Sequence, residues 1–494
     1  MTSCYIIIAR DFFYFYFVFV KTYNSIAEIQ SDLFDNKFTV TELTKSYIDK
    51  IESKKHLNIF LEVFEKSAVE KAALVDEKIK SKNAGRLAGV VISIKDNICY
   101  KNHKISASST ILDSFESLFS ATVVERLLAE DAIIIGRTNC DEFAMGSSNE
   151  NSAFGNVLNP LDENRVPGGS SGGAAAAVAA DLCLVALGTD TGGSIRQPAS
   201  FCGVVGLKPT YGRVSRYGAI AYASSFDQIG PLAKNIEDIA LIMEIMAGGD
   251  NYDSTAASSA VPTYSKLVND IIPKTRIAYI KDCLENEGLD PEIKSRINEV
   301  IIKLKSEGHI VEEVDFPYLD YLVPAYYVLT TAEASSNLSR YDGITYGYRS
   351  PNATDLESTY KKSRSEGFGI EVQRRIMLGT FVLSSGYYEA YYSKGQKVRR
   401  LIQNKTNEIL NNYDFILLPT TPGTAFKFGQ KGEDPIAMYL EDIFTVQANM
   451  TGIPAISLPI GKHSNKMPFG IQVMAKKFAE QELFCFSKHL MNRF

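Results

Sequence analysis

Residues 168–198 read GGSSGGAAAAVAADLCLVALGTDTGGSIRQP and place two glycine-flanked serine clusters on either side of a helix–strand pair. Glycine tolerates positive φ and close backbone approach, so each cluster is typical of a tight turn that exposes its serines. A run of glycine and serine is also typical of a flexible linker. Here the alanine-rich stretch 172–180 predicts a helix, and DLCLVALGTD predicts a buried strand that ends at the second turn. The two turns therefore belong to a packed fold.

Helices and strands alternate on both sides of this stretch. Upstream, LAGVVISIKDN (87–97) predicts a buried strand, and SATVVERLLAEDAIIIGRTN (120–139) predicts a helix followed by a strand. Further strands are predicted downstream, in the stretches 275–281, 308–316, 413–422, 454–460 and 468–475. This alternation predicts an α/β fold with one large mixed, mostly parallel sheet covered by helices, whose ligands lie beyond the carboxyl ends of the strands.

The chain of 494 residues is long enough for about two to four domains, but the continuing alternation favours one extended sheet. We divide this single domain, residues 25–494, into a helical N-terminal segment (25–84), a core (85–250) and a C-terminal part of the same sheet (270–494). Thr39 or Thr41 is the expected N-cap of the second helix.

Residues 1–24 form an unusual N-terminal segment, with nine apolar or aromatic residues in a row from Phe12 to Val20. Such a run is too short to cross a bilayer as a helix, and no small-residue cleavage site follows it. We expect a tail that lies outside the fold and makes no membrane contact. The alternative, a membrane anchor, predicts recovery of the protein with membranes.

Composition argues against several classes of function. The net charge of −6 gives no sign of a basic surface, so the chain is not expected to make the main contacts with a nucleic acid. The seven cysteines include no Cys-x-x-Cys pair, which favours a reducing cytoplasm and argues against zinc, and we expect no metal. The sequence also contains no Gly-x-x-x-x-Gly-Lys-Ser/Thr loop for nucleotide phosphates.

Lys95 ends the predicted strand 87–97 and is a candidate general base. Burial lowers the pKa of an ammonium group, so a lysine here can become a neutral amine that accepts a proton. A solvated lysine at the end of a strand is the simpler interpretation. The serine turns at other strand ends favour the base, because a serine nucleophile needs one within hydrogen-bond reach. The five histidines lie in no recognisable catalytic setting.

The residues from about Gly89 to Pro231 resemble the amidase signature family, which carries a lysine at a strand end, a glycine-flanked serine pair and a Gly-Gly-Ser-Ile turn. The resemblance implies that Ser194 is the nucleophile, Ser170 the bridging serine in a cis peptide, and Lys95 the base. It thus implies amide hydrolysis through an acyl-enzyme. Successive backbone N–H groups can converge on the developing oxyanion, and these belong to Thr191, Gly192, Gly193 and Ser194.

Within that family, the resemblance is closest to the A subunits of aspartyl/glutamyl-tRNA amidotransferases, over most of residues 25–480. Stretches outside the shared motif carry it, among them GRTNCDEFAMGSSNENSAFGNVLNP, RRIMLGTFVLSSGYYEAYY and MYLEDIFTVQANMTGIPAISLP. It implies a glutaminase that supplies ammonia for amidating Glu-tRNA(Gln), with Asp-tRNA(Asn) open as a second acceptor. It also implies a heterotrimer with B- and C-type subunits, with ATP, Mg²⁺ and the main tRNA contacts on a partner and no cofactor in this chain.

Glutamine is a zwitterion, so a glutaminase needs opposite charges to hold it. By resemblance, Arg375 binds the carboxylate and Asp442 the ammonium group, with Tyr326 lining the pocket. The neighbouring Arg374 and Tyr327 are open alternatives for two of these roles. Without the resemblance, each charge would be interpreted as an ordinary solvated helix residue.

Two other functions fit parts of the sequence. A stand-alone amidohydrolase would use the same triad on another amide, without a zwitterion site or a partner, and glutamine competition in an ammonia assay separates it from a glutaminase. A non-catalytic assembly protein would keep only the scaffold, and the intact set of Lys95, Ser170 and Ser194 argues against it.

Overall fold

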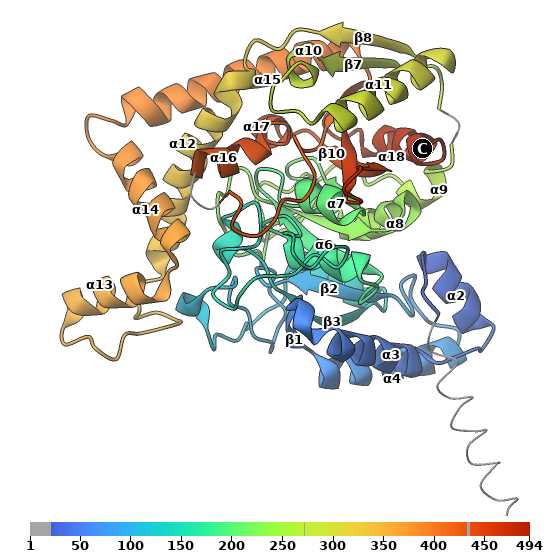
Figure 1. The fold of residues 1–494 in the computed structure, drawn as a ribbon. Coiled ribbons are helices and arrows are strands. Elements are labelled where there is room, and N and C mark those ends of the chain that lie inside the picture. The colour runs from blue at the N-terminus through green and yellow to red at the C-terminus, as the bar shows by residue number, and fades with distance from the viewer. Residues whose placement is uncertain (1–20, 271, 432–434) are drawn as a thin grey trace, which may run out of the picture.

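The computed structural model describes residues 21–270, 272–431 and 435–494. Its eleven strands form one sheet in the order β1–β3–β2–β4–β6–β5–β10–β11–β9–β7–β8 (Figure 1). The strands are β1 (Phe60–Val63), β2 (Val91–Lys95), β3 (Ile133–Thr138), β4 (Val185–Asp190), β5 (Val205–Lys208), β6 (Gln228–Ala233), β7 (Arg276–Ile280), β8 (Ile310–Val314), β9 (Phe415–Pro419), β10 (Ala455–Lys462) and β11 (Pro468–Ala475).

Helices cover this sheet. They are α2 (Ile26–Phe34), α3 (Val40–Ser53), α4 (Glu65–Lys80), α5 (Thr122–Ala129), α6 (Gly172–Ala179), α7 (Arg196–Cys202), α8 (Ile236–Met246), α9 (Tyr264–Leu267), α10 (Lys281–Leu284), α11 (Pro291–Ser306), α12 (Leu319–Asn337), α13 (Leu356–Gly367), α14 (Ile370–Leu383), α15 (Lys394–Asn412), α16 (Pro435–Tyr439), α17 (Val446–Thr451) and α18 (Glu480–Met491). None of these helices is long and apolar enough to cross a membrane.

The sheet is mixed, as predicted, but it is not mostly parallel. β2 runs parallel to β3 and β4, and β7 runs parallel to β8 and β9. The other six neighbouring pairs are antiparallel. β5 and β6, which the sequence pattern did not predict, run antiparallel to their neighbours, and the β10–β11 hairpin adds another antiparallel pair. Gly230 and Pro231 inside β6 hide its strand pattern.

The parallel trio β3–β2–β4 positions the two serine turns. Because β2 and β4 pair in parallel, with Ile94 opposite Leu187, their carboxyl ends lie at the same edge of the sheet. Lys95 ends β2 at this edge, and Asp190 ends β4. The serine pair 170–171 directly precedes α6, which packs on both strands. Both turns therefore meet beside Lys95.

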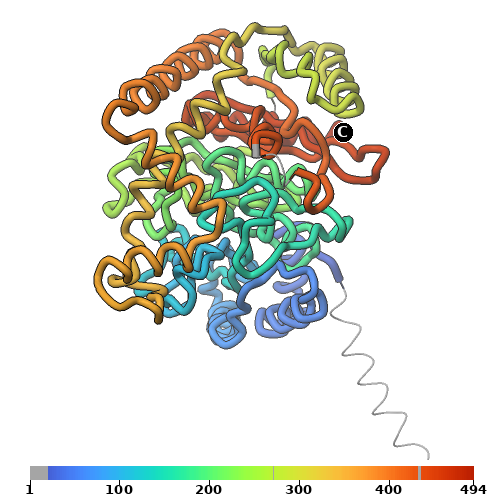
Figure 2. The backbone as a smooth tube through the Cα atoms, turned by 60° about the vertical axis from the view of Figure 1, so that its left-hand side comes forward, coloured from blue at the N-terminus to red at the C-terminus, as the bar shows by residue number. Residues whose placement is uncertain are grey.

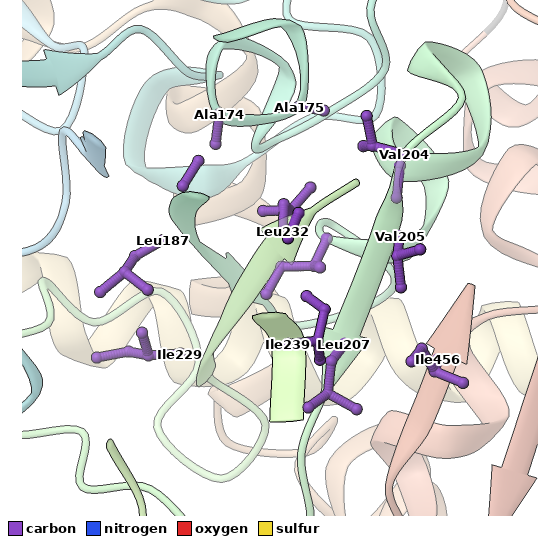
Figure 3. Packing of buried hydrophobic residues seen from close by; sticks show 14 of the residues in the cluster. Ala174, Ala175, Leu187, Val204, Val205, Leu207, Ile229, Leu232, Ile239 and Ile456 are labelled. Carbon is purple, nitrogen blue, oxygen red and sulfur yellow. The ribbon is translucent and has the colours of Figure 1, made fainter. Parts of the chain in front are cut away.

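The alanine-rich α6 holds the first serine turn against the middle of the sheet. Figure 3 shows Ala174 and Ala175 of α6 near Leu232 of β6. These three side chains are fully buried. Small alanines let the helix approach the strands closely, and a densely packed helix keeps its N-terminus in one place.

The predicted helical segment 25–84 contains α2, α3 and α4, and Thr39 is the N-cap of α3 in a capping box with Glu42. It also contains β1, which pairs antiparallel with β3 and shows that the segment is not wholly helical. The stretch FLEV has too few residues to display a strand period between two amphipathic helices.

The predicted boundary of the N-terminal tail at residue 24 lies inside the packed structure. Tyr23 is buried against Phe38, and its hydroxyl donates to Asp32 Oδ2 at 3.1 Å. The apolar run Phe12–Val20 lies outside the described residues.

A second set of helices stands at one side of the sheet, where Figures 1 and 2 show α12, α14 and α15 in yellow and orange. α12 packs against α14 and α15 and also contacts α17. This arrangement brings α14, the helix of Arg375, and the chain near residue 442 to the region beside the serine turns.

Candidate active site

Three hydroxyl groups surround the amine of Lys95. Its Nζ lies 2.7 Å from Ser170 Oγ, 3.0 Å from Ser171 Oγ and 2.9 Å from Thr189 Oγ1. The lysine side chain is fully buried, and this burial lowers the pKa of the amine. All three partners are neutral, so none of them forms an ion pair that would hold the amine in its charged form. We call Lys95, Ser170, Ser171, Thr189 and Ser194 the reactive cluster.

The hydrogen bonds around Lys95 indicate where its protons lie. Ser171 Oγ donates its only proton to the carbonyl of Thr189 at 3.0 Å, so the amine must donate to Ser171. Thr189 Oγ1 accepts from Nδ2 of Asn97 at 3.0 Å and has a second lone pair for the amine. A neutral amine has two protons and one lone pair. With both protons donated to Ser171 and Thr189, its lone pair is left to accept the proton of Ser170.

The backbone around Ser170 is held from both sides. The peptide bond between Gly169 and Ser170 is cis, as the resemblance implies. The carbonyl of Ser170 accepts from the N–H of Asp141 at 3.2 Å, and the N–H of Gly169 donates to Gln197 Oε1 at 2.8 Å. A Cβ at position 169 would lie 2.1 Å from Asp141 Oδ2, so the close approach of this carboxyl requires glycine. Burial raises the pKa of Asp141 to about 6.

Ser194 lies in the second turn and, at 8% exposure, is the most accessible member of the reactive cluster. Its Oγ makes no hydrogen bond to any residue that the structure describes, Ser170 included. The two serine turns are joined through the backbone instead, because the N–H of Ser171 donates to the carbonyl of Ser194 at 3.1 Å. The structure therefore places Ser194 beside the serine pair and leaves its hydroxyl available.

The N–H groups of residues 191–194 are of two kinds. The N–H of Gly193, whose φ is +135°, donates to Asp190 Oδ1 at 3.0 Å. The N–H groups of Thr191, Gly192 and Ser194 donate to no residue in the described part of the chain. This corrects the prediction for Gly193. Its N–H is not an available donor for the oxyanion, because it already donates to the carboxylate of Asp190.

Asp190 fixes the turn through a buried ion pair. Arg196 Nη2 lies 2.9 Å from Asp190 Oδ1, and neither side chain is exposed. The N–H of Ile195 donates to Asp190 Oδ2 at 3.1 Å. Burial alone would raise the pKa of Asp190, but the guanidinium of Arg196 more than offsets it and the pKa falls to about 2. The carboxylate that anchors the turn is therefore ionised across the ordinary pH range.

Arg375 of α14 lies among aromatic rings. Its guanidinium carbon lies 5.6 Å, 5.2 Å and 5.7 Å from the ring centroids of Tyr222, Tyr327 and Tyr439. Its Nη1 donates to the hydroxyl of Tyr222 at 2.9 Å, and its Nε donates to Glu371 Oε1 at 2.8 Å. No described residue accepts a hydrogen bond from Nη2, so this nitrogen of the guanidinium group is available to a ligand.

The structure separates Arg375 from its alternative Arg374. The Arg375 side chain is only 5% exposed, whereas that of Arg374 is 48% exposed. Both contact the carboxylate of Glu371, Arg374 through Oε2 and Arg375 through Oε1. Arg375 is therefore the interior cation, and Arg374 is a surface residue.

Asp442 lies at the end of a short 3₁₀ helix (Leu440–Asp442) and is buried. Its Oδ2 accepts from Ser147 Oγ at 3.0 Å and from the hydroxyl of Tyr327 at 3.3 Å. Burial raises the pKa of Asp442 to about 7, against the opposing effects of Ser147 and Arg375. Tyr327 thus touches both charges, with its ring toward Arg375 and its hydroxyl on Asp442. We call Tyr222, Tyr326, Tyr327, Arg375 and Asp442 the charge pocket.

Tyr326 lies where the charge pocket meets the turn of Ser194. A Cβ at Gly192 would lie 2.4 Å from the hydroxyl oxygen of Tyr326, so the two are in close contact. This hydroxyl makes no hydrogen bond within the described ranges, whereas that of Tyr327 is engaged by Asp442. The two tyrosines therefore do different things, and Tyr326 is the one that lies against the turn.

Comparisons with known proteins identify the family of this chain. The family model described as Amidase matches residues 42–484. The chain belongs to the amidase family.

Several relatives of this amidase are glutamyl-tRNA(Gln) amidotransferase A subunits. That of Chlorobium phaeobacteroides is 50% identical over 462 residues, which cover 93% of this chain and 97% of the relative. The crystal structure of the Thermotoga maritima subunit, 41% identical, matches with a TM-score of 0.75 over 91% of this chain and 90% of its own. The peptide amidase of Stenotrophomonas maltophilia matches with a TM-score of 0.80 at 27% identity, over 96% and 98% of the two chains.

Asp227 is a site residue of this amidase that sequence reasoning missed. It accepts from Thr191 Oγ1 at 2.7 Å and from the N–H of Tyr222 at 2.9 Å, and so joins the turn of Ser194 to the charge pocket. Burial raises its pKa to about 6. Its stretch YASSFDQIGP supports the family resemblance, but nothing in the stretch alone marks this aspartate as a link between two distant elements.

Within the described residues, one group of side chains has metal-ligand types: Glu307, His309 and His489, whose ligand atoms lie within 4.8 Å of one another. The Nδ1 of His309 accepts from the N–H of Thr275 at 3.2 Å, so the neutral ring carries its proton on Nε2 and has no free lone pair there. His489 already pairs with Glu307 at 2.8 Å. The arrangement suits a hydrogen-bonded cluster better than a metal site.

Proposed function

We propose that this amidase hydrolyses glutamine as the A-type subunit of a tRNA-dependent amidotransferase and supplies ammonia for the amidation of Glu-tRNA(Gln). One observation carries the proposal: two buried opposite charges, Arg375 and Asp442, are bridged by Tyr327 beside the turn of Ser194. A zwitterion matches such a pair, because its carboxylate can bind the unoccupied Nη2 of Arg375 and its ammonium group the carboxylate of Asp442, whereas a neutral amide can use neither charge. The names of the relatives support the same function.

The reactive cluster has the groups that an acyl transfer needs. Lys95, as a neutral amine, takes the proton of Ser170, Ser170 takes the proton of Ser194, and Ser194 Oγ attacks the side-chain carbonyl of glutamine. The proton then returns through Ser170 to the leaving nitrogen, the C–N bond breaks, and ammonia leaves a glutamyl ester on Ser194. Water attacks this ester by the same proton route and releases glutamate. Ser194 Oγ and Ser170 Oγ form no hydrogen bond in the absence of substrate, and the proposed relay requires this hydrogen bond to form when substrate is bound.

The N–H groups of Thr191, Gly192 and Ser194 are the proposed donors to the oxyanion. They have no partner in the described part of the chain, so no hydrogen bond has to break before they bind the developing charge. Tyr326, in contact with Gly192, lines the same space.

The charge pocket orients the substrate. The free Nη2 of Arg375 donates to the α-carboxylate of glutamine, and Asp442 accepts from its α-ammonium group. Fixing both ends of the amino acid presents its side-chain carbonyl to Ser194, which converts an encounter into an oriented reaction. Arg375 is itself held in orientation by Tyr222 and Glu371.

The proposal assigns tRNA, ATP and Mg²⁺ chiefly to B- and C-type partner subunits of a cytoplasmic heterotrimer. A chain with a net charge of −6 and no phosphate-binding loop lacks the features that would bind them itself. Asp-tRNA(Asn) is a second acceptor that the same assay examines.

The test uses the purified full-length chain. We expect it alone to release ammonia from glutamine slowly and to amidate no tRNA, with amidation of Glu-tRNA appearing only when the two partner subunits, ATP and Mg²⁺ are added. Ser194→Ala is the matched control for contaminating glutaminase. Amidation of tRNA by the chain alone would contradict the assignment of tRNA and ATP binding to partner subunits. Efficient hydrolysis of a neutral amide without inhibition by glutamine would favour the stand-alone amidohydrolase.

A further inference from the structure

Thr445, which directly precedes α17, connects the charge pocket to the nucleophile turn. Its Oγ1 lies 2.6 Å from the carbonyl oxygen of Gly192 and 3.0 Å from that of Asp442. Its own N–H also donates to the Asp442 carbonyl at 3.0 Å. Because this N–H already satisfies Asp442 and the hydroxyl has one proton, the shorter contact shows that the proton goes mainly to Gly192. The side chain is fully buried, so no water competes for this hydrogen bond.

The hydrogen bond from Thr445 completes a closed ring of contacts. The carbonyl of Gly192 and the N–H of Gly193 belong to one planar peptide unit. Thr445 holds the carbonyl end, and Asp190 holds the N–H end at 3.0 Å. Asp190 pairs with Arg196, whose Nη1 donates back to the carbonyl of Thr445 at 2.8 Å. Every link of the ring is buried.

The orientation of this peptide unit matters because the N–H groups proposed to bind the oxyanion lie on either side of it. If ψ of Gly192 or φ of Gly193 changes without compensation by the other, the N–H of Gly192 and the N–H of Ser194 no longer point in the same relative directions. The position is also sterically closed, since a Cβ at Gly193 would lie 2.3 Å from Thr445 Oγ1. Thr445 therefore fills the space against the turn and donates the hydrogen bond that stops it from rotating.

We propose that Thr445 is a positioning residue that fixes the oxyanion turn, and that it acts on the chemical step for any amide and not on the binding of glutamine. The inference rests on the proposed function only in the choice of glutamine as one of two substrates. Thr445 touches Asp442 through the backbone carbonyl, not through the carboxylate, so its loss leaves the ammonium contact in place.

The experiment compares Thr445→Val with Thr445→Ser in the full-length chain, using glutamine and a neutral primary amide as substrates. Valine keeps the shape of threonine and removes the hydroxyl, whereas serine keeps the hydroxyl. We expect Thr445→Val to lower kcat for both substrates by a similar factor of about 10 to 100, between the loss of one hydrogen bond and the loss of an oxyanion donor. The KM for glutamine should stay within about twofold, and Thr445→Ser should keep kcat within about threefold of the parent.

Thr451→Val is the matched control, because Thr451 is also buried and its hydroxyl donates to the helical carbonyl of Gln447 at 2.8 Å without touching the turn. It should keep kcat within about twofold. Three results would overturn the proposal: a loss confined to glutamine, a change mainly in KM, or a tenfold loss in Thr445→Ser. The kcat of Thr445→Ser tests the proposal even if Thr445→Val does not fold. A parent chain that hydrolyses the neutral amide but not glutamine contradicts the proposed function alone, since the neutral amide still reports on Thr445.

Discussion

The reactive cluster and the charge pocket lie side by side but are built in opposite ways. The cluster places one amine among neutral hydroxyls, and no ion pair is formed within it. The pocket buries a guanidinium and a carboxylate and separates them with tyrosine rings. Burial has a different use in each. In the cluster it lowers the pKa of Lys95, which favours the neutral amine, whereas in the pocket it keeps water from screening the charges that are proposed to bind glutamine.

The two regions also differ in how the chain assembles them. Lys95 and Thr189 lie on two adjacent parallel strands, β2 and β4, and Ser170 lies just before α6, which packs on both strands. Arg375 and Asp442 come from α14 and a 3₁₀ helix that no shared sheet edge brings together. We therefore expect the chemical step to depend on strand topology and the choice of substrate to depend on packing between distant helices. Substitutions should therefore fall into two classes, those that affect every amide and those that affect glutamine alone.

The largest effect is expected from removing the nucleophile or the base. Ser194→Ala and Lys95→Ala should each lower kcat for glutamine and for a neutral amide by about 10³-fold or more, and the double variant should be little worse than either, because members of one relay act as a unit. Ammonia release and trapping of the acyl-enzyme are the measurements. Near-normal turnover in Lys95→Ala would show that another group is the base.

Ser170 and Ser171 provide a matched pair inside the reactive cluster, since both contact Lys95 Nζ. Ser171 gives its proton to the Thr189 carbonyl and so cannot pass one to the amine. We expect a loss in kcat of about 10³-fold for Ser170→Ala and only about tenfold for Ser171→Ala. Equal losses would mean that the proton order derived from these contacts is incorrect.

Arg375 and Arg374 are the matched pair of the charge pocket. Arg375→Lys loses the planar fork that holds a carboxylate and should lower kcat/KM for glutamine by about 100-fold, with the neutral amide little affected. Arg374→Lys, at the surface, should change kcat/KM by no more than about twofold. Steady-state kinetics on both substrates is the measurement. A comparable loss in Arg374→Lys would reverse the assignment.

Asp442→Asn removes the charge that is proposed to bind the substrate ammonium group but keeps the size of the side chain. We expect kcat/KM for glutamine to fall by about 30-fold, mainly through KM, because the lost contact is not to the reacting carbonyl. The neutral amide should be hydrolysed about as well as by the parent. If both substrates lose activity equally, Asp442 has only a structural role.

The sequence pattern predicted the reactive cluster more fully than the charge pocket, for a physical reason. A lysine at the end of one strand and a serine turn at the end of the next must meet if the strands are parallel neighbours, and β2 and β4 are. Arg375 and Asp442 came only from resemblance, because helix periodicity shows which face is apolar but not which helix it meets. The same limit hid Asp227 and Thr445, which act across long sequence separations.

Two of the errors in the prediction share one cause. Gly193 was expected to donate to the oxyanion, and the sheet was expected to be mostly parallel. In both cases a local pattern was read without its partner: the carboxylate of Asp190 occupies the Gly193 N–H, and β5 and β6 insert antiparallel strands beside β4. Backbone groups and strand directions depend on what packs next to them, which residue order alone does not specify.

The smallest predicted effect is a pH dependence that belongs to glutamine alone. Burial raises the pKa of Asp442 to about 7, while hydrogen bonds from Ser147 and Tyr327 and the charge of Arg375 lower it and Glu441 raises it further. The carboxylate is the form that binds an ammonium group, so binding weakens as the pH falls through about 7 and Asp442 takes up a proton. Titration of Lys95 affects every amide and therefore cancels when kcat/KM for glutamine is divided by that for a neutral amide. This ratio should be highest near pH 8, where Asp442 is ionised and glutamine still carries its ammonium group, and fall by up to about tenfold per pH unit below 7. In Asp442→Asn the ratio should be low and independent of pH, and a slope that persists in this variant would assign the titration to another group.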